Sequence, residues 1–496
     1  MLEGLKPENV FYYFEKICGI PHGSGNTRQI SGYLVDFAEK RNLEHYQDEA
    51  GNVIIIKEAS SGYGDHEPVI LQGHMDMVAV KGPSVSIDME KDGLQLVVDG
   101  DRLMAEDTSL GADDGIALAY SLALLAGDYR HPRIETVFTV DEEVGLSGAR
   151  ELDVSPLKAK RLINLDSEEE GIFLAGCAGG ARVNISLPIE KEKRDGIFCE
   201  ISISGLQGGH SGEEIDKERG NAICLLGRVL GSLSGEIDFC IENMQGGVAD
   251  NAIPSFARAD VLITGYVCDG SRQEIGQSRF SYEECIRRVK VACGKLSREL
   301  AEELADKDKD VRLEAVCKAV RCGAGVQGPE AKRVISFLLS LPWGVQAMSA
   351  GVQGLVETSL NPGLLSMEQD CLKIGISVRS SLESAKTALI GRIESLAYLA
   401  GAQTEVTGDY PGWAFKKDSP LREKMTQVYR KLYGREPVVE AIHAGLECGL
   451  LAHKIPGLDC VSIGPDMQNI HTVKEELSIV SARRVWEFLL KLLEAL

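Results

Sequence analysis

Residues 68–76 read PVILQGHMD, an apolar run that stops at a histidine and a carboxylate two positions apart. The run over 69–72 predicts a strand. Side chains two apart on an extended backbone share a face, so Asp76 can hydrogen-bond the ring nitrogen of His74 that a metal leaves free. Taken alone, the pair fits a solvated strand end better than a functional site, so its meaning depends on the rest of the chain.

Strand and helix patterns alternate around this run. The spacing of apolar residues predicts helices over 8–20, 27–41 and 113–126, and strands over 52–57, 134–140 and 161–165. After 408–412 the same alternation resumes, with a helix over 421–432, a strand over 460–463 and a last helix from Ser481. This order predicts an α/β domain with a mostly parallel sheet and helices on both faces, formed by residues 1–190 and 402–496.

The middle of the chain has a different pattern of predicted strands and helices. A charged run at 191–196 interrupts the alternation, and strand candidates at 198–203 and 372–378 then occur with long polar helices such as 282–307. We therefore expect an inserted α+β domain over 191–401, which is long enough for two α/β units. A chain of 496 residues also exceeds the roughly 250 to 300 at which one core stops growing.

The composition excludes several classes of function. Hydrophobic residues make up 44% and charged residues 26%, which is ordinary for a soluble globular protein. The first twenty residues predict an amphipathic helix and not a signal peptide. A formal net charge of -22 opposes binding to nucleic acid or to anionic membranes. Thirteen cysteines without a Cys-x-x-Cys pair fit reduced thiols, and we expect a cytoplasmic location.

Further polar residues follow the predicted strands, where open α/β sheets place their ligands. Asp113 lies in SLGADDG (109–115) at a helix start, and Glu142 and Glu143 lie in FTVDEEVG (138–145). Asp166 ends LINLD (162–166), and His471 follows a strand and a loop. Each has an ordinary alternative, because an aspartate at a helix start can be an N-cap and an acidic run can be a solvated surface.

Three carboxylates and two histidines at one sheet edge would repel one another or be poorly solvated unless a cation held them. Two divalent metals resolve this problem. Mixed imidazole and carboxylate ligands suit Zn²⁺ best, with Mn²⁺ or Co²⁺ as alternatives. In a two-metal hydrolase the ions share a water of increased acidity, and Glu142 is the candidate to take its proton.

These motifs, in this order, resemble those of the M20 family of di-zinc metallopeptidases. Four further motifs resemble the aminoacyl-histidine dipeptidase (Xaa-His dipeptidase, peptidase D) branch, namely GGHSG at 208–212, NAIP at 251–254, SVRS at 377–380 and AIHAGLECG at 441–449. The resemblance covers nearly the whole chain. Three positions depart from the branch pattern: Asp114 stands where asparagine is expected, Glu106 adds an acid, and Val473 replaces a common proline.

The resemblance implies a role for each residue. One metal would lie on His74 and Asp166 and another on Glu143 and His471, with Asp113 bridging both and a cis peptide after it. Glu142 would be the general base, and Asp76 would orient His74. On the substrate side, His210 would stabilise the oxyanion, Asn251 and Arg379 would bind the terminal carboxylate, and Glu447 would contact substrate.

The reaction implied is hydrolysis of unblocked dipeptides, of Xaa-His type with broad specificity, by a hydroxide that bridges the two metals. The alternatives are an N-acyl-amino-acid deacylase or carboxypeptidase on the same metal core and, more remotely, a non-catalytic binding protein of this fold. The inserted domain would be a lid of the type that also forms homodimers. If it holds two units, we expect His210 to act in its own chain and not in a neighbouring subunit. The extra acids Asp114 and Glu106 leave metal preference open.

Overall fold

The computed structural model describes residues 2–264 and 280–496. The chain forms two compact units, Met1–Cys177 with Trp413–Leu496 and Ala178–Gly412. The boundaries predicted from the sequence, at 190/191 and 401/402, lie about a dozen residues too far inside the second unit. The reason is that strands β9 (Gly179–Pro188) and β19 (Gln403–Tyr410) pair with each other in the sheet of that unit.

The first unit is built on an eight-stranded sheet with the order β1-β2-β6-β3-β7-β21-β8-β20. The central strands β6, β3, β7 and β21 run parallel to one another, which confirms the predicted sheet. The strands are β1 (Glu44–Gln47), β2 (Val53–Lys57), β3 (Val69–His74), β6 (Ile134–Thr139), β7 (Arg161–Asn164), β8 (Ile172–Cys177), β20 (Val438–Ile442) and β21 (Asp459–Ser462).

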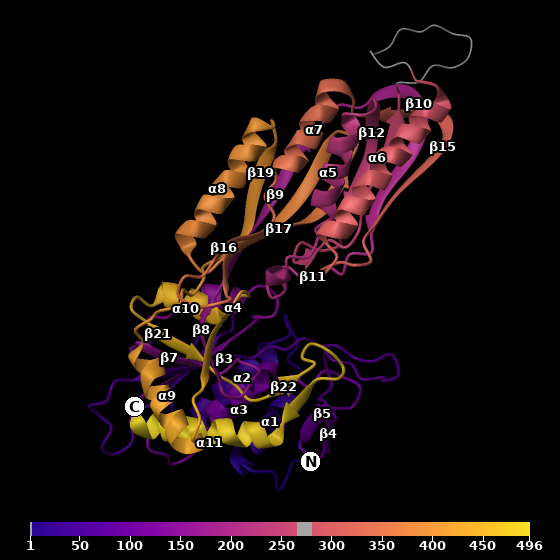
Figure 1. The fold of residues 1–496 in the computed structure, drawn as a ribbon. Helices are drawn as coiled ribbons and strands as arrows, with labels where there is room; N and C mark the ends of the chain where they lie inside the picture. The colour runs from indigo at the N-terminus through magenta and orange to yellow at the C-terminus, as the bar shows by residue number, and fades with distance from the viewer. Residues whose placement is uncertain (1, 265–279) are drawn as a thin grey trace. The chain divides into compact units, whose positions relative to one another are not determined.

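Alternate side chains of these strands enter two different cores, so the sheet is buried on both faces. Val53 and Ile55 of β2 pack into one cluster, whereas Ile54 and Ile56 pack into the other. The helices of this unit flank the sheet (Figure 1). They are α1 (Glu8–Cys18), α2 (Arg28–Glu39), α3 (Ala112–Ala126), α4 (Ser147–Glu151), α9 (Pro420–Tyr433), α10 (Glu447–Lys454) and α11 (Ile479–Ala495).

A small antiparallel sheet, which the sequence patterns did not predict, completes the first unit. Its order is β22-β23-β5-β4. It joins β22 (Met467–Gln468) and β23 (Glu476–Ser478) to β5 (Arg102–Ala105) and β4 (Leu96–Asp99). The loop between β22 and β23 carries His471, and the pairing of β23 with β5 joins it to the last strand before α3.

The second unit is an α+β structure with one nine-stranded antiparallel sheet, whose path runs β15-β10-β14-β12-β17-β18-β9-β19, with β16 beside β17. Besides β9 and β19, this sheet contains β10 (Glu192–Ser204), β12 (Phe239–Gly246), β14 (Ala257–Ile263), β15 (Arg312–Gly325), β16 (Gly344–Met348), β17 (Val356–Met367) and β18 (Cys371–Ser380). Two short strands, β11 (Gly209–His210) and β13 (Ala252–Ile253), form a separate pair, and η1 (Ile215–Lys217) is one 3-10 turn.

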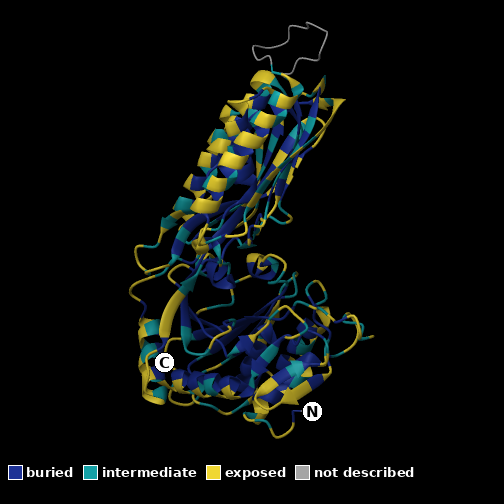
Figure 2. Ribbon diagram, turned by 45° about the vertical axis from the view of Figure 1, so that its right-hand side comes forward, coloured by how far each residue is buried: buried dark blue, intermediate teal, exposed yellow. Residues whose placement is uncertain are grey.

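Four helices cover one face of this sheet (Figure 1), namely α5 (Ala222–Ser234), α6 (Tyr282–Glu303), α7 (Gly328–Ser340) and α8 (Glu383–Leu399). Their outer sides are exposed and their inner sides buried (Figure 2). The expected two α/β units are therefore one structure, since the pairs Gln245↔Ser366 and Gly246↔Leu365 between β12 and β17 join two groups of strands. The charged run at 191–196 is also not a loop, because β10 begins at Glu192.

Among the described residues, no helix is long and apolar enough to cross a membrane.

Gly73 marks the closest approach between β3 and α3. A Cβ at this position would lie 2.5 Å from both Ala117 Cβ and Asp114 Oδ2. We expect Gly73→Ala to lower the free energy of unfolding by about 1–3 kcal/mol, as overpacked core substitutions do. Urea unfolding measures this, with Gly64→Ala as the control, because a Cβ at Gly64 meets nothing within 4 Å. Equal stability of the two variants would contradict the packing described here.

Candidate metal centre and active site

The polar residues predicted at strand ends do meet at one edge of the first unit's sheet. His74 is the last residue of β3, Glu142 and Glu143 follow β6, and Asp166 follows β7. These three strands are parallel neighbours, so their carboxyl ends share an edge. Asp113 joins them from the first turn of α3.

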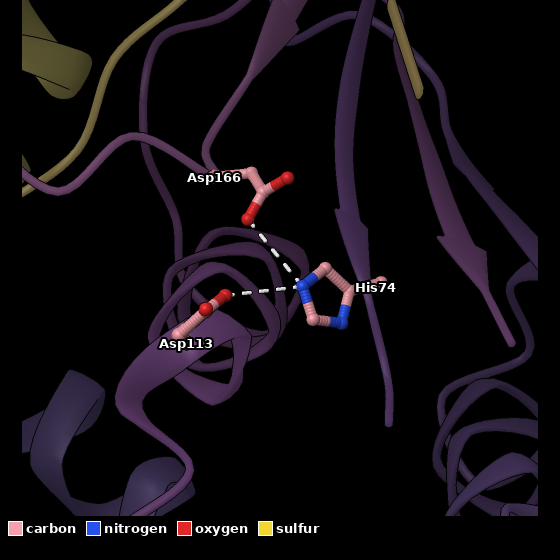
Figure 3. A group of neighbouring side chains, drawn as sticks. All are labelled: His74, Asp113 and Asp166. Atoms are coloured by element: carbon pink, nitrogen blue, oxygen red, sulfur yellow. Dashed lines mark hydrogen bonds and ion pairs between the residues drawn. The ribbon is translucent and has the colours of Figure 1, made fainter. Parts of the chain in front are cut away.

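The first cluster consists of His74, Asp113 and Asp166 (Figure 3). The imidazole of His74 is 1% exposed, and its Nε2 lies 3.1 Å from Asp113 Oδ1 and 3.4 Å from Asp166 Oδ1. One ring nitrogen thus faces two carboxylates, from α3 and from the loop after β7. A nitrogen donor and two oxygen donors at this spacing can hold one metal ion.

The second cluster shares Asp113 with the first. Asp113 Oδ2 lies 3.1 Å from His471 Nε2, which in turn lies 2.8 Å from Glu143 Oε1. Within each cluster the donor atoms lie within 4.8 Å of one another. The two oxygens of Asp113 therefore face two different histidines, which is the arrangement expected of a carboxylate that bridges two metals.

The backbone around Asp113 departs from a regular helix. Gly111 has φ +67°, and Asp113 itself has φ -83° and ψ 102°. The peptide bond between Asp113 and Asp114 is cis, as the family resemblance implied. This irregular turn directs the Asp113 carboxylate toward both histidines.

Asp76 contacts more of the site than the sequence suggested. Its backbone carbonyl oxygen lies 3.0 Å from His74 Nδ1, and its carboxylate Oδ1 lies 3.4 Å from the same atom. The carboxylate also accepts hydrogen bonds from the backbone N–H groups of Glu142 (3.0 Å) and Glu143 (3.3 Å) and from the Ser24 hydroxyl (2.9 Å). Asp76 therefore holds both the His74 ring and the loop that carries the two glutamates.

The carboxylates change the acidity of both histidines. Hydrogen bonds to Asp113 and Glu143 raise the pKa of His471 to about 10. Burial disfavours a charged ring at His74, but the charge of Asp166 and the hydrogen bond to Asp113 outweigh it and raise the pKa of His74 well above its usual value. Burial of Asp113 is likewise outweighed by its hydrogen bonds with both histidines, and its pKa is lowered. Without metal, these contacts favour the positively charged form of both rings.

A pH dependence of metal binding follows, because a metal ligand must be a neutral imidazole. Binding of two ions should release about two protons, so affinity should rise with pH by roughly tenfold per unit for each proton displaced. Calorimetric titration of the metal-free protein with Zn²⁺ between pH 6 and 8, in buffers of different ionisation enthalpy, measures both quantities. An affinity independent of pH, with no proton release, would contradict this charge state.

Burial also raises the pKa of three further acids at the centre. The pKa of Glu142 is raised well above its usual value by burial and by the charges of Asp166, Glu447 and Glu143, with His74 opposing. Burial raises the pKa of Asp166 to about 6 and that of Glu447 to about 7. Glu142 is thus placed among the ligand candidates as a carboxyl group that binds a proton readily.

Glu447 is held by side chains of two strands of the sheet. Its side chain is fully buried and accepts hydrogen bonds from Thr139 Oγ1 (2.6 Å) and from the amide of Gln72. Gln72 in turn accepts one from Asn164 at 2.6 Å. The Glu447 carboxylate thus links α10 to β3 and β6, and its predicted contact with substrate stays a prediction.

The three residues predicted to bind substrate from the inserted segment lie in the second unit. His210 of β11 pairs with Ala252 of β13, so it is adjacent to Asn251. The Glu213 N–H donates to His210 Nδ1 at 3.1 Å, which leaves the Nε2 of a neutral ring with the proton. Burial, then the charge of Arg379, lowers the pKa of His210 and favours that neutral form. The Nε–H of Arg379 is buried without a partner among the described residues.

The two additional acids have different positions. Asp114 is fully buried, and its Oδ2 accepts the backbone N–H of His74 at 3.1 Å. Burial, with the charge of Asp166, raises the pKa of Asp114 well above its usual value, which favours its neutral form. Glu106 is exposed and lines a surface depression together with residues 84–87, 91–93 and 95.

Sequence reasoning missed three residues that support the site. Ser24 holds Asp76, and Glu475 accepts hydrogen bonds from the backbone that leads into Asp113. In the second unit, the Asn361 amide donates to the carbonyl oxygens of Asp250 and Ala252 on either side of Asn251. None belongs to an apolar pattern, so no periodicity marks it. Of the three, only Glu475 could have been suspected from the sequence, because it lies four residues after the candidate ligand His471.

Comparison with known proteins adds an independent line of evidence. A model of peptidase family M20/M25/M40 matches residues 70–495. The chain belongs to this family. It is 36% identical to the cytosol non-specific dipeptidase of Escherichia coli (strain K12), over 99% of this chain and 98% of that protein.

Solved structures agree with this M20 assignment. The aminoacylhistidine dipeptidase of Vibrio alginolyticus is 34% identical, with a TM-score of 0.91 over 100% of this M20 chain and 98% of the other. The aminopeptidase PepT of Bacillus cereus, at 17% identity and a TM-score of 0.56 over 99% of both chains, shares the fold. The Escherichia coli and Vibrio alginolyticus dipeptidases both match this chain over nearly its whole length. The resemblance seen in the motifs therefore extends to both units.

Proposed function

We propose that this chain is a metal-dependent dipeptidase that hydrolyses the peptide bond of unblocked dipeptides. The observation that carries the proposal is the bridging position of Asp113, whose two oxygens face His74 and His471 at 3.1 Å each. The names of the two relatives that match along the whole chain, both dipeptidases, support the substrate class. We further propose Xaa-His dipeptides among a broad range of substrates.

The donor atoms fit two divalent ions. His74 and Asp166 would hold one, Glu143 and His471 the other, and Asp113 both. One imidazole and two carboxylates in each cluster favour Zn²⁺, with Mn²⁺ and Co²⁺ as alternatives, over the oxygen-only preference of Mg²⁺ and Ca²⁺. Two such ions, when bound, would acidify a water and polarise a substrate carbonyl group.

The side chains around the centre have distinct tasks in this proposal. Glu142 takes a proton from the attacking water and delivers it to the leaving amine, for which a carboxyl group of raised pKa is suited. Asp76 keeps Glu142 and Glu143 in place through their backbone N–H groups. His210 donates its Nε2–H to the oxyanion that forms on the substrate carbonyl.

Arg379 and Asn251 would bind the carboxylate at the substrate's C-terminal end. The planar guanidinium can donate two parallel hydrogen bonds to a carboxylate, and the unpartnered, buried Nε–H of Arg379 provides a donor for this purpose.

We also propose a cytoplasmic location. The twelve described cysteines are all free thiols, and the Escherichia coli relative is named a cytosol enzyme. Reduced thiols in such number are typical of cytoplasmic proteins.

A comparison of substrate classes tests the proposal. The purified enzyme is assayed with free dipeptides, with the matching N-acetyl amino acids and with tripeptides of the same residues. We expect kcat/KM to be highest for the free dipeptides. Faster hydrolysis of the acetylated compounds would instead establish a deacylase, and faster hydrolysis of tripeptides or longer peptides a carboxypeptidase.

A further inference from the structure

Glu475 is a buried carboxylate that lies against the backbone entering α3. Its side chain accepts hydrogen bonds from four successive N–H groups, and the residue is only 3% exposed. Oε2 accepts from Leu110 at 2.8 Å and Gly111 at 3.1 Å, and Oε1 accepts from Ala112 at 2.8 Å and Asp113 at 3.4 Å. Both oxygens are therefore engaged on the segment that presents Asp113.

The chemistry of this contact explains why a carboxylate stands there. The first N–H groups of a helix have no partner within the helix and carry partial positive charge. Burying a carboxylate is costly unless its oxygens accept hydrogen bonds. Glu475 and the start of α3 each supply what the other lacks, so the backbone from Leu110 to Asp113 is fixed by an acid from a distant part of the sequence.

The same acid is tied closely to His471. Only three residues separate them, and the Glu475 N–H donates to the carbonyl of Thr472 at 3.2 Å. The Thr472 hydroxyl donates to the carbonyl of Asn469 at 2.7 Å. His471 is thus held in a turn whose far end is anchored on the Asp113 segment, and its Nε2 lies 3.1 Å from Asp113 Oδ2.

Asp76 is built in the same way. It lies two residues after His74, and its carboxylate accepts the N–H groups of Glu142 and Glu143. In both cases a buried acid next to a histidine fixes the backbone of another segment that supplies a carboxylate to the centre. Two separate anchors of one kind indicate that the positions of the candidate ligands are fixed through their backbones.

We propose that Glu475 is a positioning residue of the metal centre, which fixes Asp113 relative to His471 and so forms the cluster of Asp113, Glu143 and His471. This inference rests on the ligand assignment made under the proposed function. Glu475 belongs to neither ligand cluster, and both of its oxygens accept backbone N–H groups. In the second cluster Glu475 anchors two of the three residues, Asp113 and His471, whereas in the first it anchors Asp113 alone. Loss of Glu475 should therefore weaken metal binding at the second cluster more than at the first.

The test compares zinc binding by two variants. Glu475→Gln keeps the size of the side chain but turns an NH₂ group toward N–H groups that need an acceptor. Glu135→Gln is the matched control, since Glu135 is also fully buried and accepts backbone N–H groups from Lys158 and Ala159, but at the opposite end of β6. Each full-length protein is stripped with a chelator and titrated with Zn²⁺ against a competing chromophoric chelator.

We expect Glu475→Gln to bind its second equivalent of Zn²⁺ at least tenfold more weakly than Glu135→Gln, even where both variants show the same drop in melting temperature. Glu475→Asp, which keeps the charge and shortens the reach, should lie between wild type and Glu475→Gln. If Glu475→Gln does not fold, binding of the second Zn²⁺ by Glu475→Asp provides the test. If both Glu475 variants bind two equivalents of Zn²⁺ as tightly as Glu135→Gln does, the inference is wrong.

A fourth variant separates this inference from the proposed function on which it rests. His471→Ala should lose tight binding of the second equivalent. If it does while the Glu475 variants keep both, only the positioning role is wrong. If His471→Ala binds zinc as wild type does, the ligand assignment itself is wrong and the role of Glu475 is withdrawn with it.

Discussion

Glu142→Gln should lower kcat by about 10²–10⁴-fold while both metal clusters keep their affinity. Glutamine keeps the shape and the backbone N–H that donates to Asp76 at 3.0 Å, but it cannot accept a proton. Steady-state hydrolysis of a free dipeptide at saturating Zn²⁺ measures the loss, and zinc titration establishes that the centre is intact.

Glu151→Gln is the control for this variant, because Glu151 is an exposed acid at the end of α4 in the same unit. It should leave kcat unchanged. A Glu142→Gln enzyme with more than a tenth of wild-type kcat would contradict the assignment of Glu142 as general base.

Asp113→Ala should weaken both metals at once. The Asp113 carboxylate belongs to both clusters, whereas His74 belongs only to the first and His471 only to the second. We expect both dissociation constants to rise by more than the roughly 10–100-fold that loss of an outer-shell partner causes. Metal analysis after dialysis, together with zinc titration, measures the change.

Two single-cluster variants make the comparison specific. His74→Ala and His471→Ala should each retain one ion with an affinity close to that of wild type. Two ions retained by Asp113→Ala, or a loss of both ions in only one of the histidine variants, would show that Asp113 does not bridge the clusters.

Much of the first unit could be predicted from the sequence, because its buried strands are short apolar runs. The run over 69–72 became β3, and the runs at 134–140 and 161–165 became its parallel neighbours β6 and β7. Once these strands are parallel neighbours, the residues after them must share an edge. That is why His74, Glu143 and Asp166 could be placed together without a structure.

The second unit was harder to predict because all of its helices in the described part of the chain lie against one face of its sheet. In β10 the residues Ile197, Cys199, Ile201 and Ile203 are buried, whereas the residues between them are partly exposed and polar or charged at Glu200 and Ser202. The charged run before them continues the same strand beyond the core. Its charge pattern is that of a loop, so the sequence did not show that β10 begins at Glu192.

The anchors of the site could not be predicted because they join distant residues through backbone atoms. The Asp76 carboxylate reaches N–H groups 66 and 67 positions away, and Glu475 reaches those of Leu110 to Asp113 more than 360 positions away. A hydrogen bond to a backbone N–H places no demand on the side chain of the donor residue. Such contacts therefore leave no motif in the segment that is held.

Glu447 is a residue whose motif could be recognised in the sequence but whose packing could not. The string at 441–449 indicated a site residue, but the structure buries its carboxylate against Thr139 and Gln72. A motif indicates that a residue lies close to a site, whereas burial and hydrogen-bond partners decide whether it can contact a substrate.

The most direct test of a two-metal dipeptidase is metal removal and return. The full-length enzyme is stripped with a chelator, its metal content is measured, and hydrolysis of a free dipeptide is followed as Zn²⁺ is added back. We predict no activity without metal and full recovery only as the second equivalent of Zn²⁺ binds. Dipeptide hydrolysis that persists after complete metal removal would contradict the account.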